Sequence, residues 1–451
     1  MSAEPSVPEP ERPGPGGRGR ALPPRIVLWV AGGVFVMILA VAFYYSPMHF
    51  GLDRIRAQWA FDDGVEHDKE NRRDQAIERY DRAIRLNPEL VEAYNNRGSD
   101  RRRKGDLDGA IADYGEVIRL RPDTEAGYYN RAVTWRMKGD DEAALSDFAA
   151  AIVKGRAQLQ WLQQHRGGGQ IGLLTNARLK LDARSNLSDA YLGRARALED
   201  KGNYEDAIVS LDEAIAVAET TWPSEAHFER ARVRLLKGQF AEAEAEFDRF
   251  VADKAGYLSG ALMYRGFLAL FRANDPKAAA ENFERSLQEG FAQPGTLRGL
   301  FDGSGPWLSN GVRLYPNVHH LIVWQHVARE RTGQDDRKEL TENLLRLARR
   351  QGYSTASDDA MAKSRANWPG PIIDMFLRTR TPEAVRAAAE ASADPKVRRQ
   401  QTCDADFYTG LFRLKSAKAE ARALLQRAAD NCPPGTFAGV GARLELERAG
   451  T

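Results

Sequence analysis

The chain has 451 residues, of which 28% are charged, and its formal net charge is +2 at pH 7. This is the composition of an ordinary globular protein. A net charge so close to zero gives no overall electrostatic attraction to nucleic acid, so we expect no nucleic acid among its partners.

Residues 1–25 are rich in Pro, Gly and Arg and hold almost no apolar side chains. Such a segment cannot form a core, so we predict a disordered tail. The tail carries Arg12, Arg18, Arg20 and Arg25. The positive-inside tendency therefore places this tail, and with it the N-terminus, in the cytoplasm.

Residues 26–45 contain no charged side chain. At about 1.5 Å per residue, a helix of this length spans roughly the 30 Å core of a bilayer. Trp29, Tyr44 and Tyr45 lie near its ends, where aromatic residues favour the membrane interface. We predict a single transmembrane signal anchor with the rest of the chain outside. A cleaved signal peptide is the alternative, because residues 40–42 satisfy the small-x-small rule for cleavage after Ala42.

Residues 53–155 contain three units with one spacing: a small residue, an Ala twelve positions later and an aromatic residue four positions beyond. The three sets are Gly64, Ala76 and Tyr80; Gly98, Ala110 and Tyr114; and Ala132, Ala144 and Phe148. This pattern resembles the tetratricopeptide repeat. The resemblance implies an all-α fold, an α-solenoid of helical hairpins that binds other proteins on its concave face.

Four Lys-Gly dipeptides fall at the expected break between the two helices of a unit. Their glycines are predicted to have positive φ and to end the first helix: Gly105, Gly139, Gly202 and Gly238. Three degenerate units follow in residues 188–290. Between the two sets, residues 156–187 are predicted to be an insertion that contains a linker helix and a Gly-rich loop.

The last third of the chain is predicted to contain an irregular helical region, 291–402, and a terminal hairpin, 403–451. A Trp368-Pro369 segment precedes the Phe407-Tyr408-Thr409-Gly410 motif. This part resembles the NlpI-like repeat proteins of the bacterial cell envelope. The resemblance implies a periplasmic adaptor that docks envelope enzymes such as hydrolases or proteases. The chain differs from that family because an apolar helix replaces the lipid anchor, which predicts an inner-membrane location.

The two cysteines are Cys403 and Cys432. We expect them at the start and just past the end of the last hairpin, where antiparallel helices bring both ends together. A disulfide is predicted there, and it agrees with an exported domain. Two reduced buried thiols are the alternative.

The concave surface of such repeats is lined by fixed positions of each first helix. Here these positions are Phe61, Asn95, Arg102, Arg103, Tyr129, Arg136, Arg196, Phe228 and Arg232. Arginine can hold carboxylates in bidentate geometry, and aromatic residues are common at interfaces, so this set is our predicted protein-binding groove. A merely solvated arginine-rich face is the alternative. The carboxylate clamp of chaperone-binding repeats is absent, since its lysine positions hold Phe61, Asn95 or Tyr129.

Few residues indicate chemistry. Residues 167–172 match a dinucleotide motif, but no strand precedes them, so we expect a loop. His319, His320 and His326 lie on one expected helix without a carboxylate or cysteine at metal spacing, so we expect them to pack. Residues 303–305 lack the context of a nucleophile elbow. We therefore predict no cofactor, no metal and no enzyme.

The sequence thus predicts a membrane-anchored periplasmic scaffold for protein partners. An accessory subunit of an inner-membrane biogenesis or secretion machine, such as one for cytochrome c maturation, is the main alternative. An enzyme would have to use unfamiliar chemistry in region 291–402. A homodimer through exposed terminal repeats stays open.

Overall fold

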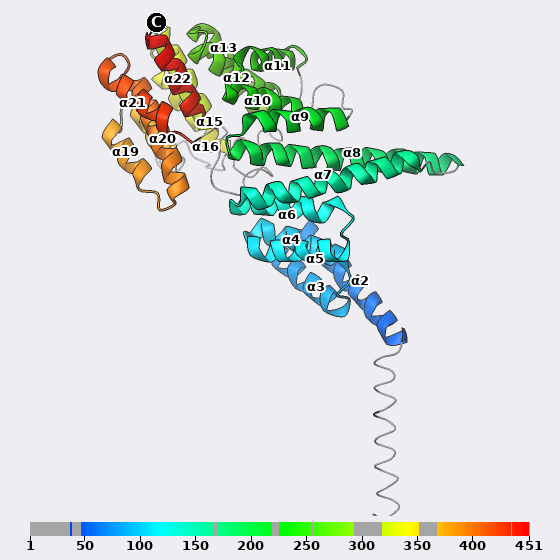
Figure 1. Ribbon diagram of the computed structural model, residues 1–451. Helices are drawn as coiled ribbons and strands as arrows, with labels where there is room; N and C mark the ends of the chain where they lie inside the picture. Colours follow the sequence, from blue (N-terminus) through cyan, green and yellow to red (C-terminus); the bar gives the residue numbers. More distant parts are fainter. Residues whose placement is uncertain are drawn as a thin grey trace, which may run out of the picture. The chain divides into compact units, whose positions relative to one another are not determined.

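A computed structural model describes residue 37 and the ranges 47–165, 169–218, 225–254, 257–292, 318–350, 368–433 and 435–450. Every regular element in these ranges is a helix (Figure 1), which confirms the all-α prediction for this part of the chain. The chain divides into two compact units, Met1–Leu90 and Val91–Thr451.

The first unit contains one described hairpin, made of α2 (Pro47–Lys69) and α3 (Arg73–Leu86). Tyr80 is fully buried in it, and the ring of Phe61 lies 5.8 Å from the Tyr80 ring. Apart from Met37, the predicted tail and anchor lie outside the described residues. Among the helices that are described, none is long and apolar enough to cross a bilayer.

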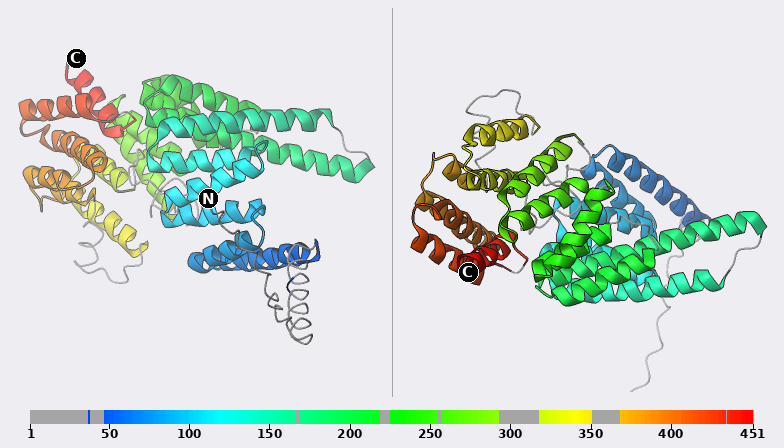
Figure 2. Two further views of the ribbon diagram at one scale, coloured as in Figure 1. Left: turned by 60° about the horizontal axis from the view of Figure 1, so that its bottom comes forward. Right: turned by 90° about the horizontal axis from the view of Figure 1, so that it is seen from above.

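The second unit begins with five successive hairpins. They are α4 (Val91–Lys104) with α5 (Leu107–Leu120), α6 (Glu125–Lys138) with α7 (Asp141–Gln164), α8 (Gly169–Asp200) with α9 (Tyr204–Ala218), α10 (Glu225–Lys237) with α11 (Phe240–Ala252), and α12 (Leu258–Phe271) with α13 (Pro276–Ala292). Figure 2 shows these helices stacked side by side in chain order. Each hairpin has an apolar face that it cannot bury by itself, and the neighbouring hairpin covers that face.

The turns inside these hairpins follow the prediction. The φ angles of Gly105, Gly139, Gly202 and Gly238 are 88°, 85°, 76° and 93°, so each glycine takes the left-handed conformation that ends a helix. In three of the hairpins with such a glycine, the next helix then starts with a side-chain cap, from Asp106, Asp140 or Asn203. Asp140, for example, accepts a hydrogen bond from the backbone N–H of Ala143 at 3.0 Å.

The predicted insertion at 156–187 has a different structure from the one expected. Instead of a separate linker helix, α7 continues through Gln164, and α8 starts at Gly169 and runs to Asp200. Residues 166–168 of the predicted Gly-rich segment lie outside the described residues. The residues after Arg156 are Ala, Gln, Leu and Trp, with no Gly or Pro to stop the helix. Residues 169–172 therefore belong to the first turns of a helix, and the insertion lengthens a repeat hairpin.

The C-terminal part contains seven further helices among the described residues. They are α15 (Val318–Arg331), α16 (Arg337–Arg350), α18 (Gly370–Phe376), α19 (Pro382–Glu390), α20 (Pro395–Arg413), α21 (Lys418–Asn431) and α22 (Phe437–Gly450). We expected a hairpin from residue 403. The structure instead starts α20 at Pro395, because Asp394 caps its N-terminus, and adds α22 as a third helix.

The largest buried side chain of this part is Trp324 of α15, which is 0% exposed. Its ring lies 5.1 Å from that of Phe267 in α12, 6.0 Å from Phe283 in α13 and 6.1 Å from Phe437 in α22. Offset aromatic contacts of this kind add to the free energy gained from burial. The last helix therefore packs back on α12, which joins the C-terminal helices to the repeat array.

Recurring ion pairs hold single hairpins together. Arg97 and Arg131 occupy the same position in consecutive units, and each bonds an aspartate 16 residues later. The Arg97 Nε–Asp113 Oδ2 distance is 3.0 Å, and the Arg131 Nε–Asp147 Oδ2 distance is 2.7 Å. Arg230 makes the same contact with Glu246 at 3.0 Å. These pairs join the first helix of a hairpin to its second helix.

Candidate protein-interaction surface

The first helices of successive hairpins contact one another in the second unit, α4 with α6 and α6 with α8. We call the row of first helices α4, α6, α8, α10 and α12 the inner face. Side chains bridge it directly: Asn130 donates to Asn95 at 2.9 Å, and Arg136 donates to Asp200 at 2.9 Å. Eight of the nine predicted groove residues belong to these helices. Phe61 belongs to the first unit and packs on Tyr80.

Two of the predicted groove arginines are not available to a partner. Arg196 and Arg232 are 7% and 1% exposed. Arg196 donates to Glu225 at 2.6 Å and to Glu229 at 3.0 Å. Their assignment as groove residues is therefore wrong, because carboxylates of α8 and α10 already occupy their guanidinium donors.

The pKa values of the buried glutamates reflect these contacts. Burial alone would raise the pKa of Glu229, but Arg232 and Arg196 flank it and hold the pKa at about 2. Burial raises the pKa of Glu199, although Arg232 donates to it. Together these side chains form a charged network inside the array, which we call the Arg–Glu network: Arg196, Glu199, Glu225, Glu229 and Arg232.

Phe228 is also mainly a packing residue. Its ring stacks on that of Tyr257 at 5.0 Å and meets the edge of Phe250 at 5.7 Å. It is half-buried as a result. Tyr129 packs edge-on against Phe148 at 6.0 Å and is likewise half-buried on the inner face.

The remaining predicted residues form an accessible strip over α4 and α6. Asn95, Arg102, Tyr129 and Arg136 are partly exposed, and Arg103 is exposed. Burial raises the pKa of Tyr129, and nearby Asp189 raises it further, whereas Arg196 and Arg102 act in the opposite direction. Arginine donors beside a tyrosine ring can bind carboxylate and aromatic groups of a protein partner. We call these five residues the accessible strip.

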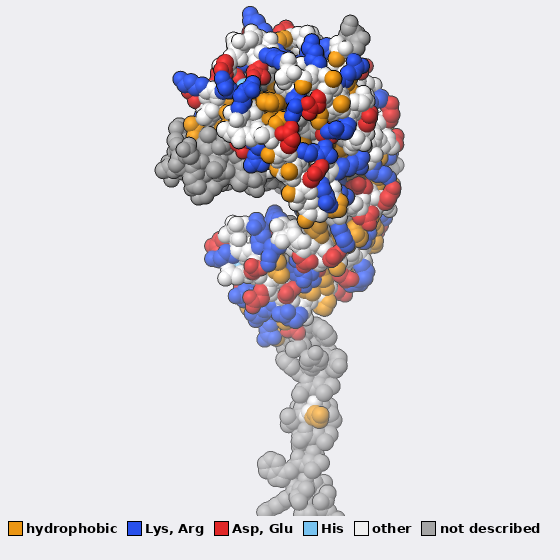
Figure 3. Space-filling view, turned by 90° about the vertical axis from the view of Figure 1, so that its left-hand side faces the viewer, with side chains coloured by type: hydrophobic (Ala, Val, Ile, Leu, Met, Phe, Trp, Pro, Cys, Tyr) orange, Lys and Arg blue, Asp and Glu red, His pale blue; other side chains and the backbone are white. Residues whose placement is uncertain are grey.

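Figure 3 shows one side of the molecule, on which Lys and Arg side chains alternate with Asp and Glu. No extended field of one sign covers the described part of this view. A mixed surface of this kind matches the small net charge of +2. It favours selective contacts over general attraction to a polyanion.

The Sγ atoms of Cys403 and Cys432 form a disulfide in the structure, with the Cα atoms 5.1 Å apart. Cys403 lies inside α20, and Cys432 directly follows α21. The bridge therefore joins one helix of the terminal hairpin to the end of the other.

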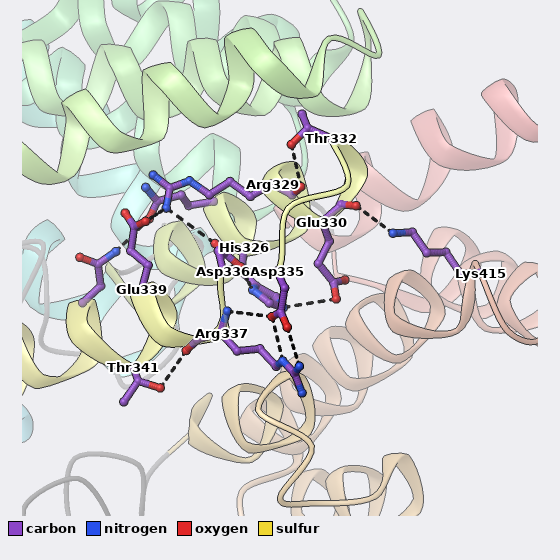
Figure 4. Close-up of polar contacts among 12 residues, drawn as sticks. His326, Arg329, Glu330, Thr332, Asp335, Asp336, Arg337, Glu339, Thr341 and Lys415 are labelled. Carbon is purple, nitrogen blue, oxygen red and sulfur yellow. Dashed lines mark hydrogen bonds and ion pairs between the residues drawn. The ribbon is translucent and has the colours of Figure 1, made fainter.

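The histidines of α15 take part in packing and helix-end contacts. His320 lies 5.7 Å from the Tyr408 ring, and Nδ1 of buried His326 is hydrogen-bonded to Asp336. Figure 4 shows His326 and Arg329 pointing at the start of α16, where Asp336 and Glu339 meet them. These contacts fasten α15 to α16. Among the residues the structure describes, no group of His, Cys, Asp and Glu could hold a metal ion.

A hollow of about 470 Å³ lies between α15, α18, α20 and α22. Phe376 and Phe412 line it together with Arg331, Lys415 and Arg448. All three cations already have partners: Arg331 donates to Glu445 at 2.6 Å, Lys415 to the Glu330 carbonyl at 2.8 Å and Arg448 to Asn274 Oδ1 at 2.6 Å. The side chains therefore serve helix packing, and no predicted site residue lines the hollow.

Repeat spacing could have revealed the Arg–Glu network. Arg196 and Glu229 are 33 residues apart, as are Glu199 and Arg232. This separation is close to one repeat, so each pair joins consecutive first helices. Opposite charges at that spacing in the sequence could have predicted ion pairs between consecutive units. We missed them because each unit was considered by itself.

Two family models match the chain. A tetratricopeptide-repeat model matches residues 69–99 and 98–139, and a second tetratricopeptide-repeat model matches residues 188–257. No curated protein sequence matches the chain significantly. The matched residues lie within the regular units, 53–155, and the degenerate units, 188–290, found from the spacing.

Several solved structures are similar to the chain. A tetratricopeptide repeat protein from Parabacteroides merdae is 14% identical, with 72% of this chain and 98% of that chain covered and a TM-score of 0.38. PilF of Pseudomonas aeruginosa is 13% identical, with 54% and 95% covered and a TM-score of 0.39. Yeast Tom70 is 13% identical, with 87% and 95% covered and a TM-score of 0.25.

Repeats of this type generally mediate contacts between proteins. The narrower resemblance of the C-terminal part to NlpI-like proteins stays a prediction. The family models and the hairpins of the structure agree on the repeats themselves, and the chain contains tetratricopeptide repeats within residues 69–139 and 188–257.

Proposed function

We propose that the chain is a membrane-anchored scaffold that binds protein partners in the bacterial periplasm through its inner face. The observation that carries this proposal is the accessible strip, where Arg102, Tyr129 and Arg136 are partly exposed on α4 and α6, with Arg136 also bonded to Asp200 at 2.9 Å. The neighbouring Arg–Glu network is closed by its own contacts. A partner segment with carboxylates would fit the strip, since arginine donors bind them in bidentate geometry.

The location rests on the sequence at the two ends of the chain. Residues 26–45 are uncharged and long enough for a bilayer-spanning helix, and an arginine-bearing tail precedes them. The disulfide of the terminal hairpin suits an oxidising compartment. Envelope hydrolases or proteases are the partner class that the resemblance to NlpI-like proteins suggests.

The test is capture of crosslinked partners from membranes by the intact chain, followed by mass spectrometry. Envelope hydrolases or proteases among the partners would support the adaptor. Subunits of a biogenesis or secretion machine would favour the alternative of an accessory subunit. Cytosolic partners together with free thiols at Cys403 and Cys432 would overturn the location.

A charge-reversal pair tests the strip itself. Arg102→Glu with Arg136→Glu should abolish capture while the helical circular dichroism stays unchanged. The matched control is Arg82→Glu with Arg119→Glu, because both arginines are exposed on second helices, α3 and α5. Equal capture by both double variants would remove the accessible strip from the proposal.

A further inference from the structure

The hairpin of α7 and α8 projects from the stack. α7 has 24 residues and α8 has 32, whereas α5 and α6 have 14 each. At about 1.5 Å per residue, α7 is longer than α6 by roughly 15 Å. Both views in Figure 2 show the two helices running past their neighbours. We call residues 156–164 of α7, the following His165, and residues 174–187 of α8 the projecting arm.

The arm holds itself together with a small set of side chains. Leu162, Ala183 and Leu187 are 4%, 2% and 1% exposed. Near the free end, the Asn176 side chain donates to the His165 carbonyl at 2.6 Å. These contacts join the two helices without help from the apolar side chains on the outside of the arm.

Four large apolar side chains of the arm face solvent. Trp161, Leu174, Leu179 and Leu181 are 56%, 73%, 47% and 62% exposed. Leu174 and Leu181 are seven residues apart and therefore share one face of α8. The Trp161 ring stacks on His165 at 4.4 Å and keeps more than half of its surface exposed. Leu179, two residues before Leu181, points to nearly the opposite side of α8, so the exposed apolar side chains lie on more than one side of the arm. Exposed apolar surface in this amount is typical of an interaction site.

The charge of this stretch is one-sided. Residues 148–181 contain no Asp or Glu but contain Lys154, Arg156, Arg166, Arg178 and Lys180. Because 63 of the 451 residues are acidic, a stretch of this length would hold about five acidic residues on average. The Arg156 side chain pairs back to Glu213 of α9, and Arg178 pairs with Asp182 on α8 at 3.2 Å. Arg178 and Lys180 lie farther out on the arm than Arg156.

The arm carries Leu and Trp beside Arg156, Arg178, Lys180 and Arg184, with Asp182 as its one acidic residue. Apolar side chains beside an excess of positive charge are the combination that binds the interface of anionic bilayers. Trp favours the headgroup level, and the basic side chains are attracted to anionic lipids. A second copy of the chain fits poorly, because two arms of the same positive charge repel each other. We propose that the projecting arm binds the surface of an anionic lipid bilayer. This contact is separate from the predicted N-terminal anchor and does not require it.

The experiment uses the full chain, oxidised so that the native cysteines are blocked. Leu181→Cys carries an environment-sensitive fluorophore, and Val209→Cys on α9 is the matched control, since Val209 is 58% exposed. The labelled chain is reconstituted in neutral vesicles. The sample is then mixed with a second set of vesicles that contain nitroxide-labelled lipids. These vesicles are made of phosphatidylcholine alone or of phosphatidylcholine with phosphatidylglycerol.

We expect nitroxide quenching at Leu181→Cys only with phosphatidylglycerol, and none at Val209→Cys. Arg178→Glu with Lys180→Glu should lower the vesicle partition coefficient by about 30-fold or more, since each basic side chain near such a surface contributes roughly fivefold. Equal quenching in neutral vesicles, or none in either, would overturn the proposal. So would a spectral shift that depends on protein concentration and not on lipid, because it would indicate contact between two arms. Loss of the N-terminal anchor would abolish reconstitution but leave this quenching, so the two proposals fail separately.

Discussion

Arg232 donates to Glu199 across one repeat, with an Nη1–Oε1 distance of 2.6 Å and side-chain exposures of only 1% and 4%. The two residues come from α10 and α8, so the bond fixes the spacing of consecutive first helices. An isolated charge at this depth would be strongly unfavourable. The pair is therefore part of the array's structure and not of its binding surface.

Removal of one partner from this pair should be costly. Arg232→Met leaves Glu199 buried without its counter-charge and removes one of the two arginines that pair with Glu229. Loss of a buried counter-charge typically costs about 3 to 5 kcal/mol. We expect a lower midpoint of urea unfolding, followed by circular dichroism. Arg119→Met is the control, because the side chains of Arg119 and its partner Glu116 are 62% and 40% exposed, and its midpoint should hardly move. A double variant, Arg232→Met with Glu199→Met, should recover part of the loss.

The same network predicts a dependence on pH. Glu229 has a pKa of about 2 in the folded chain, against its ordinary value of 4.5, because two arginines flank it. A depressed carboxyl pKa stabilises the fold above pH 4.5, and this stabilisation is lost as the pH falls from 4.5 towards 2. Its size is of the order of 3 kcal/mol.

The comparison variant is Glu229→Gln, measured beside the wild type from pH 7 to pH 3 by urea unfolding. The wild type should be more stable at pH 7, and the difference should shrink below pH 4.5. Glu199 is present in both proteins, so its oppositely shifted pKa does not affect the comparison to first order. A difference that stays constant over this range would contradict the depressed pKa.

The pair within a hairpin gives a third prediction. Asp113 is 2% exposed and accepts from Arg97 Nε at 3.0 Å and from Arg101 Nη1 at 2.9 Å. Asp113→Ala removes the counter-charge of both arginines, so the unfolding free energy should fall by roughly 3 kcal/mol. Asp108→Ala is the matched control, because the Asp108 side chain is 81% exposed in its pair with Lys138. Similar losses of unfolding free energy in Asp113→Ala and Asp108→Ala would contradict the prediction that the buried pair contributes more to stability.

Much of the fold could be predicted because many helix starts and ends are determined by residues close to them in the sequence. The Lys-Gly dipeptides at Gly105 and Gly139 predict helix ends, and both glycines have positive φ in the structure. The helix starts at Pro276 and Pro382 follow from proline's preference for the first turn. These signals act over a few residues and need no knowledge of distant partners.

The failures involve contacts between units. Arg196 occupies a groove position by register, yet its partners Glu225 and Glu229 lie 29 and 33 residues away. The third helix of the terminal region packs Phe437 against Tyr264, from a distant repeat, at 5.3 Å. Neither contact can be predicted when the sequence of each repeat unit is considered by itself. The projecting arm was missed for a different reason, since Gly169 suggested a loop where a helix begins.

The terminal disulfide gives the last prediction. Cys432→Ser is the better variant, because Cys432 is half-buried whereas Cys403 is only 4% exposed, so a hydroxyl at residue 432 adds little burial cost. A bridge across a sequence separation of 29 stabilises by about 3 to 4 kcal/mol in the chain-entropy description. We therefore expect a lower melting temperature for Cys432→Ser under oxidising conditions. Dithiothreitol should lower the wild-type melting temperature to that of the variant and leave the variant itself unchanged. Wild-type protein that melts at the same temperature with and without reductant would show that the bridge does not stabilise the terminal hairpin.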